Sequence, residues 1–137
     1  MKDIQLTTNF NISEFRCKDG TDVPKEFEAN IKRLAENLQK IRDRFVEEIG
    51  HDISINIVSG YRTEAHNKKV GGALKSNHLI GIAADITLKD KRYLESLYLL
   101  ISEMIGLKDI TAGGITFYKA KNFIHYDIRG SKITWKT

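Results

Sequence analysis

The chain has 137 residues, a formal net charge of +4 and a hydrophobic fraction of 41%. This composition predicts a single globular domain at residues 1–137, and the lack of any run of about 18 apolar residues predicts that no segment spans a membrane. Cys17 is the only cysteine, which excludes an internal disulfide, and the scattered Lys and Arg residues argue against a nucleic-acid partner.

The first element that the sequence predicts is a long helix. Apolar residues recur at intervals of three and four from Phe27 to Ile49. Asp22 is a plausible N-cap, Pro24 suits the first turn, and Gly50 is a good stop. We expect this helix to be structural.

Two strands separated by a long polar segment follow the helix. Residues 52–60, DISINIVSG, alternate Ile with polar neighbours, which is typical of a half-buried strand that ends at Gly60. Residues 61–77 are polar and include Gly71 and Gly72, so we interpret them as a loop with one helical turn near Thr63 to Lys69. A loop of this length in a compact domain is often functional. Residues 82–88 form the second expected strand.

The last third of the chain predicts a helix and a hairpin. Residues 90–106 carry apolar side chains near one helical face, and strands are expected at 114–118 and 123–129, joined by the turn YKAKN. Strands of this kind beside segregated helices predict an α+β fold, with a small antiparallel sheet and helices packed on one side.

Two of the four histidines are candidates for chemistry. His51 follows the helix stop, so we expect it to cap the helix end or to be solvated, and His66 lies among polar neighbours that face solvent. His78 ends the polar loop, and Asp85 lies in the strand that follows it. His125 lies in the last strand.

Strand alternation predicts which residues lie on the same face of the strand as His125. Phe123, His125 and Asp127 share one face because alternate side chains of a strand point the same way. If the strands at 82–88 and 123–129 are neighbours, Asp85 and His125 converge, and His78 can reach the same point. Two imidazoles and one carboxylate with an open position are typical of catalytic zinc. Taken singly, each residue is more often a hydrogen-bonded structural group.

Longer motifs carry a resemblance to a known family. The stretch SNHLIGIAAD, with Ser76, His78, Gly81, Ala83 and Asp85, resembles the signature of zinc D-Ala-D-Ala carboxypeptidases and L-alanyl-D-glutamate endopeptidases, which include phage endolysins. SGYRTEAHNKKVGG, FIHYDIRG with the later Trp135, and NFNISEFRC are similar to further segments of that group, the last to those of a phage and prophage subgroup. The resemblance implies the hedgehog/D,D-peptidase fold and one Zn²⁺.

The resemblance also implies roles for individual residues. It implies that His78, Asp85 and His125 are zinc ligands, that Arg62 binds a substrate carboxylate, and that Ser76 contacts substrate or supports the site. A bidentate grip on a carboxylate suits the guanidinium of Arg62, for which a surface salt bridge is the alternative.

The general base is the point at which this sequence departs from part of the family. Some members carry an acid three positions before the last ligand, where this chain has Asn122. Asp127 shares a face with His125 and is our first choice for the base. Alternatively, Asp127 holds a ligand imidazole or Arg62 by a hydrogen bond.

The resemblance implies a zinc-dependent peptidoglycan peptidase, of D,D-carboxypeptidase or endopeptidase type, acting on wall stem peptides as a monomer. The basic charge suits an anionic wall. The N-terminus shows no signal-peptide pattern. We therefore expect synthesis in the cytoplasm and delivery to the wall, as for a phage or prophage lysin released through a holin or carried on a virion. The alternative is a catalytically degenerate, zinc-containing module that binds the wall.

Overall fold

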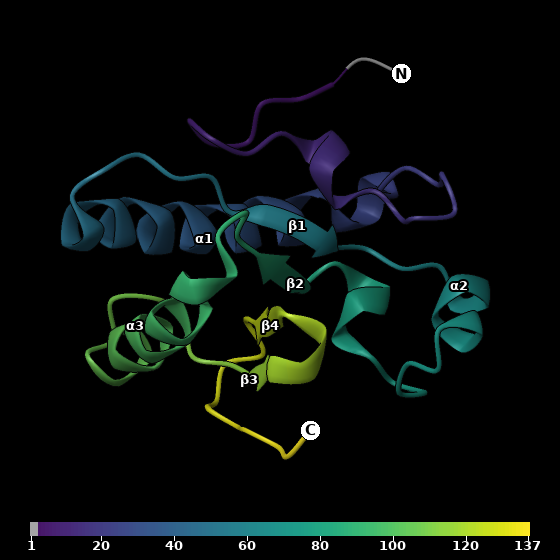
Figure 1. The fold of residues 1–137 in the computed structure, drawn as a ribbon. Coiled ribbons are helices and arrows are strands. Elements are labelled where there is room, and N and C mark those ends of the chain that lie inside the picture. The colour runs from purple at the N-terminus through teal and green to yellow at the C-terminus, as the bar shows by residue number, and fades with distance from the viewer. Residues whose placement is uncertain (1–2) are drawn as a thin grey trace.

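A four-stranded antiparallel sheet forms the centre of the protein, in a computed structural model that describes residues 3–137 (Figure 1). Its strand order is β1-β2-β4-β3, so the two middle strands come from distant parts of the chain. The strands are β1 (Asn56–Ser59), β2 (Ala83–Thr87), β3 (Ile115–Tyr118) and β4 (Phe123–Asp127).

Three helices accompany the sheet. They are α1 (Glu28–Ile49), α2 (Glu64–Lys69) and α3 (Leu94–Gly106). The long helix α1 and helix α3 pack against each other and together contribute 12 of the 28 buried residues of the hydrophobic core. Short α2 lies in the polar segment before β2, on the side of the sheet region opposite α3 (Figure 1). This arrangement confirms the predicted α+β fold.

The two faces of the sheet have different chemistry. Ala84 and Ile86 of β2, with Ile124 and Tyr126 of β4, belong to the hydrophobic core that α1 and α3 complete. The alternate residues of the same strands point away from this core. The polar residues of β2 and β4 therefore share the other face of the sheet.

The start of α1 differs from the prediction. A 3₁₀ turn at Lys25–Phe27 directly follows Pro24, and the α-helix begins at Glu28, so Asp22 is not its N-cap. The Phe27 N–H donates to the Pro24 carbonyl, which closes the tighter turn. The predicted stop is confirmed, since Gly50 has a left-handed φ of +79° and its N–H donates to Val46.

Strand β1 is shorter than predicted and irregular. It pairs with β2 only over Asn56–Ser59, because apolar alternation reports burial rather than strand pairing. Its register shifts between Ile57, opposite Ile86, and Ser59, opposite Asp85. This bulge turns Ser59 toward the polar face of the sheet.

Candidate metal centre

The pairing of β2 with β4 brings together two of the predicted ligands. Asp85 lies directly opposite His125, and Ala83 lies opposite Asp127. All four residues are on the face that points away from the core. The small side chain of Ala83 leaves room beside the two carboxylates.

His78 reaches the same point from a short turn. Its 3₁₀ turn, Asn77–Ile80, begins where the Ser76 hydroxyl accepts a hydrogen bond from the His78 N–H at 3.2 Å. The Arg62 N–H donates to the His78 carbonyl at 3.0 Å, which ties the turn to the end of β1. The structure therefore gives Ser76 a supporting contact with the turn that carries His78.

The three predicted ligands present donor atoms at spacings that suit zinc. One donor atom from each of His78, Asp85 and His125 lies within 4.8 Å of the others. The distance to Asp85 Oδ1 is 3.4 Å from His78 Nε2 and 3.0 Å from His125 Nδ1. Zinc bonds of 2.0–2.1 Å in a tetrahedron place donor atoms about 3.3 Å apart. The donor set therefore fits one Zn²⁺.

On each imidazole, one nitrogen has a hydrogen-bond partner away from the cluster and the other nitrogen faces Asp85. His78 Nδ1 lies 2.7 Å from the Gly60 carbonyl, which can only accept, so Nδ1 carries the proton and Nε2 is the donor to a metal. His125 Nε2 lies 2.8 Å from Asp127 Oδ2, so its Nδ1 faces Asp85. A partner on the second nitrogen is the usual arrangement for a metal-binding histidine.

Asp127 is enclosed and fully hydrogen-bonded. Its exposed fraction is 0%, and its two oxygens accept hydrogen bonds from His125, from the Gly114 N–H at 2.9 Å, and from Arg129 Nε and Nη2 at 2.8 and 2.7 Å. Burial alone would raise the pKa of Asp127, but these hydrogen bonds outweigh it and hold the pKa below its ordinary value of 3.8. The enclosed environment of Asp127 therefore suits a role in orienting His125 better than a role as a general base that exchanges a proton with substrate.

Electrostatics keep the aspartate at the centre of the site ionised. Burial raises the pKa of Asp85, but its hydrogen bonds with His125 and His78 dominate and hold the pKa well below 3.8. Burial lowers the pKa of His125, and its hydrogen bonds with Asp127 and Asp85 reverse that effect, so this pKa lies above 6.5. Zn²⁺ and a proton therefore compete for His125 Nδ1.

Arg62 holds the carboxylate of Asp85, the predicted third ligand. Its Nη2 donates to Asp85 Oδ2 at 3.1 Å, its Nη1 to Asn67 Oδ1 at 3.2 Å, and its Nε to Ser59 Oγ at 3.0 Å. A guanidinium has five N–H donors, so a further N–H on each Nη is left for another acceptor. Arg62 can thus hold Asp85 and still donate to a further carboxylate.

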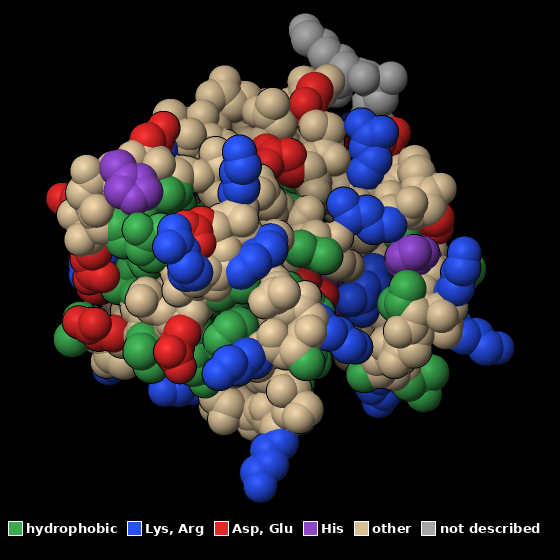
Figure 2. Space-filling view, in the orientation of Figure 1, with side chains coloured by type: hydrophobic (Ala, Val, Ile, Leu, Met, Phe, Trp, Pro, Cys, Tyr) green, Lys and Arg blue, Asp and Glu red, His purple; other side chains and the backbone are tan. Residues whose placement is uncertain are grey.

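The three predicted ligands form the floor of an open cleft of about 490 Å³. Lys75 and Ser76 lie on one wall, in the loop after α2, and Lys121 lies on the other, in the β3–β4 hairpin. Figure 2 shows Lys and Arg side chains around the hollow between α2 and this hairpin. Tyr118 and Phe123 stack on the hairpin wall with ring centroids 4.5 Å apart. The cleft therefore offers cations and flat apolar surfaces to a ligand.

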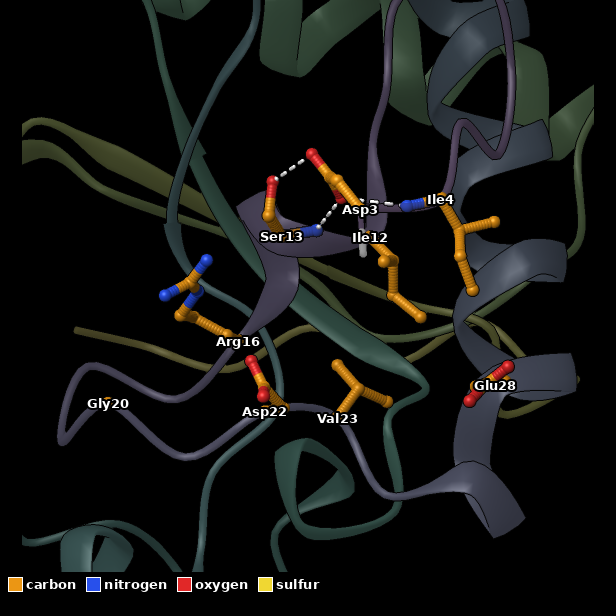
Figure 3. Close-up of a pocket in the computed structure, with 9 residues that line it drawn as sticks. All are labelled: Asp3, Ile4, Ile12, Ser13, Arg16, Gly20, Asp22, Val23 and Glu28. Atoms are coloured by element: carbon orange, nitrogen blue, oxygen red, sulfur yellow. Dashed lines mark hydrogen bonds between the residues drawn. The ribbon is translucent and has the colours of Figure 1, made fainter. Parts of the chain in front are cut away.

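A second hollow, of about 260 Å³, lies between the N-terminal segment and the start of α1 (Figure 3). Asp3 lines it, but both of its oxygens accept hydrogen bonds from Ser13. Within residues 3–137, the cluster of potential metal-binding side chains is the one in the cleft, and His51 and His66 are not part of it.

Comparison with protein families identifies the group to which this fold and site belong. A family model described as Peptidase M15 matches residues 5–127, a span that includes the whole sheet and all three predicted ligands. The chain belongs to the M15 peptidase family. M15 peptidases are zinc-dependent, so the match supports a metallopeptidase, and it agrees with a hedgehog/D,D-peptidase-like fold. Comparison with curated proteins finds no match.

Sequence reasoning missed three residues of this M15 site: Asn77, Gly114 and Arg129. Gly114 carries a signal, since Gly113 and Gly114 directly precede β3, and paired glycines in a strand region indicate a close backbone approach. A Cβ atom at Gly114 would lie 2.5 Å from Asp127 Oδ2. Asn77 and Arg129 give no such signal, because their contacts join distant segments.

Two further points from the sequence concern Asn122 and membrane-spanning segments. Asn122 lies in the β3–β4 hairpin, exposed and with a left-handed φ of +58°, and it does not line the cleft. Across residues 3–137, no helix is both long and apolar enough to cross a bilayer.

Proposed function

We propose that this M15 peptidase hydrolyses a peptide bond in the stem peptide or cross-bridge of peptidoglycan, using one Zn²⁺ held by His78, Asp85 and His125. One observation carries the proposal: three buried side chains at the floor of a cleft present donor atoms within 4.8 Å of one another, and the two distances to Asp85 Oδ1, 3.4 and 3.0 Å, are close to tetrahedral zinc spacing. A structural zinc site is instead closed by a fourth protein ligand. Among the described residues, the cluster supplies three, which leaves one position for water or substrate.

In this proposal, Asp85 and Arg62 have separate roles around the Zn²⁺. When bound, Zn²⁺ lowers the pKa of a water molecule to about 7 and polarises a carbonyl. Asp85 balances its charge, and Arg62 holds the second oxygen of Asp85. The free N–H groups of Arg62 bind a carboxylate of the substrate, which fixes the scissile bond over the floor of the cleft.

For Asp127 the geometry supports the orienting role over the general base that the sequence favoured. Its oxygens are occupied by donors from His125, Gly114 and Arg129, and no solvent reaches them. A general base must approach the proton that it takes, within about 3.2 Å or through one water. Asp127 therefore fixes the ring of His125 and makes its Nδ1 a stronger ligand.

The cleft favours anionic peptides. Lys75 and Lys121 face it from opposite walls, and neither forms an ion pair with another residue of the described chain. Stem peptides carry free carboxylates, so two cations beside the metal would draw them in. The N-terminal motif NFNISEFRC suggests a phage or prophage lysin as the biological setting.

One observation favours the second candidate, a wall-binding module without turnover. Asp85 is the only carboxylate that lines the cleft within residues 3–137, and it is already a ligand. The cleft thus lacks a carboxylate base of its own. A module of this kind would bind zinc and peptidoglycan but cut nothing.

Mass spectrometry of digested peptidoglycan decides between the two. Purified wall is incubated with the zinc-loaded protein, the protein with chelator, and His125→Ala. We expect new peptide termini only in the first sample, and the masses identify the bond that is cut. Wall that is bound but carries no new termini supports the binding module, and a protein that binds no zinc contradicts both candidates.

A further inference from the structure

Arg129 follows β4 directly and pairs with a buried carboxylate of the site. Its Nε and Nη2 donate to Asp127 Oδ1 and Oδ2 at 2.8 and 2.7 Å, and its backbone N–H donates to Oδ1 at 3.2 Å. The parallel geometry is that of a bidentate ion pair. Through Asp127, Arg129 acts on the imidazole of His125.

The same guanidinium reaches the turn that carries the other histidine. With its side-chain oxygen turned toward Arg129, Asn77 accepts hydrogen bonds from Nη2 at 3.2 Å and from Nε at 3.3 Å. Asn77 precedes His78 in the 3₁₀ turn. Arg129 therefore contacts both of the segments that supply imidazole ligands, the β4 strand and the Asn77–Ile80 turn.

Trp135 covers this arrangement from the cleft side. The Arg129 guanidinium carbon lies 5.8 Å from the centroid of the indole, in a cation–π contact. The same indole lies 5.1 Å from the ring of His125. Its Nε1–H donates to the Tyr118 hydroxyl at 2.7 Å, which fixes the indole against the hairpin. Arg129 is thus held between a carboxylate, an amide and an aromatic face.

The chain contains a second Arg–Asp pair with almost the same hydrogen bonds, Arg92 and Asp90, which serves as a comparison. Arg92 donates to Asp90 through the backbone N–H, Nε and Nη2 at 3.0, 3.0 and 2.7 Å, almost the same three contacts. The Arg92 side chain is 87% exposed, whereas the Arg129 side chain is 32% exposed and its partner Asp127 is fully buried. The buried partner and the contact with Asn77 distinguish Arg129.

We propose that Arg129 is a positioning residue that sets the spacing of His78 and His125 by joining the turn and the strand that carry them. The proposal rests on the metal centre described above, but not on peptidase activity. Loss of the guanidinium frees the turn from β4 and removes the two side-chain hydrogen bonds that fix the orientation of the Asp127 carboxylate against His125. Outer contacts of this kind are worth about 10- to 100-fold in metal affinity.

Zinc affinity, measured by competition with a chromophoric chelator, tests the proposal without a substrate. We expect Arg129→Met to bind Zn²⁺ about 10- to 100-fold more weakly than the unchanged protein. Arg129→Lys keeps the charge but not the planar fork, so we expect an intermediate loss. The matched control is Arg92→Met, which we expect to leave zinc affinity unchanged. The visible spectrum of the Co²⁺-loaded proteins should change for Arg129→Met alone.

A double-mutant cycle with Asn77→Ala separates the bridge from a general loss of stability. We expect Asn77→Ala to weaken zinc binding in the unchanged background and to have little further effect in Arg129→Met. Additive effects, or a folded Arg129→Met with unchanged affinity and Co²⁺ spectrum, overturn the proposal. If Arg129→Met does not fold, the zinc affinities of Arg129→Lys and Asn77→Ala test the proposal instead. Unchanged zinc affinity in both variants overturns the positioning role of Arg129. An unchanged protein that binds no Zn²⁺ overturns the metal centre itself.

Discussion

Asp127 accepts the Nε2–H of His125 at 2.8 Å from two positions further along the same strand, and no solvent reaches it. This contact orients the imidazole so that Nδ1 faces Asp85, 3.0 Å away. The proposed ligands His125 and Asp85 and the carboxylate of Asp127 thus lie on one face of two neighbouring strands. The sheet positions two of the three proposed ligands, and the 3₁₀ turn adds His78.

The first prediction concerns Asp127→Asn. An amide nitrogen cannot accept the hydrogen bonds that one carboxylate oxygen now accepts, so His125 loses its orientation. We expect zinc affinity to fall about 10- to 100-fold, measured by chelator competition. Asp90→Asn, in the exposed Arg92 pair, is the control and should bind zinc normally. Unchanged zinc affinity with a large loss of kcat would instead assign Asp127 as the general base.

The sequence predicted the members of this site better than their arrangement. Strand alternation alone places His125 and Asp127 on one face, since the side-chain period of a strand is fixed. The register that sets Asp85 opposite His125 depends on how β2 and β4 pair across a long stretch of chain, and local pattern does not determine it. The motif resemblance supplied that convergence, and the structure shows the geometry.

The supporting residues were the least predictable. Arg129 and Asn77 are polar residues of ordinary loops in the sequence, and only the folded chain brings them together. The Asp22 cap was wrong because a cap depends on the local backbone path, and Pro24 directs that path into a 3₁₀ turn. The gain from the structure therefore lies in contacts between segments far apart in the chain.

A second prediction concerns Arg62→Lys. The ammonium keeps the charge but cannot contact Ser59, Asn67 and Asp85 together. We expect weaker zinc binding and a higher KM for peptides that end in a free carboxylate, compared with the same peptides ending in an amide. Arg44→Lys, at the half-exposed pair with Asp109, is the control. A normal ratio of the two KM values would leave Arg62 with a role at Asp85 alone.

A third prediction follows from the raised pKa of His125. Below its raised pKa, His125 is an imidazolium that donates to Asp85 and Asp127, and Zn²⁺ must then displace the proton on Nδ1. Zinc affinity should therefore rise about tenfold per pH unit through 6.5 until the raised pKa of His125 is passed. The zinc-free protein has the opposite dependence, because a raised histidine pKa stabilises the fold at low pH and that contribution is lost as the pH rises through the folded pKa.

Isothermal titration in two buffers of different ionisation enthalpy counts the protons released per Zn²⁺. We expect about one proton near pH 6.5 and fewer at higher pH. Thermal unfolding of the zinc-free protein over the same range should show the opposite trend. Affinity that does not change with pH would mean that His125 is neutral before zinc binds.

The last prediction concerns the cations of the cleft walls. Lys75 and Lys121 lie across the cleft from each other, at its exposed rim, and act on an anionic peptide through long-range attraction. In Lys75→Gln/Lys121→Gln we expect kcat/KM for wall peptides to fall about 10-fold at low ionic strength, with kcat little changed. The difference from the unchanged protein should shrink as salt is added, because exposed charges are screened within about 10 Å at 0.1 M. Lys40→Gln, on α1 and outside the cleft, should behave as the unchanged protein. A loss in the double variant that is independent of salt would show that the two lysines bind the peptide by direct contact instead.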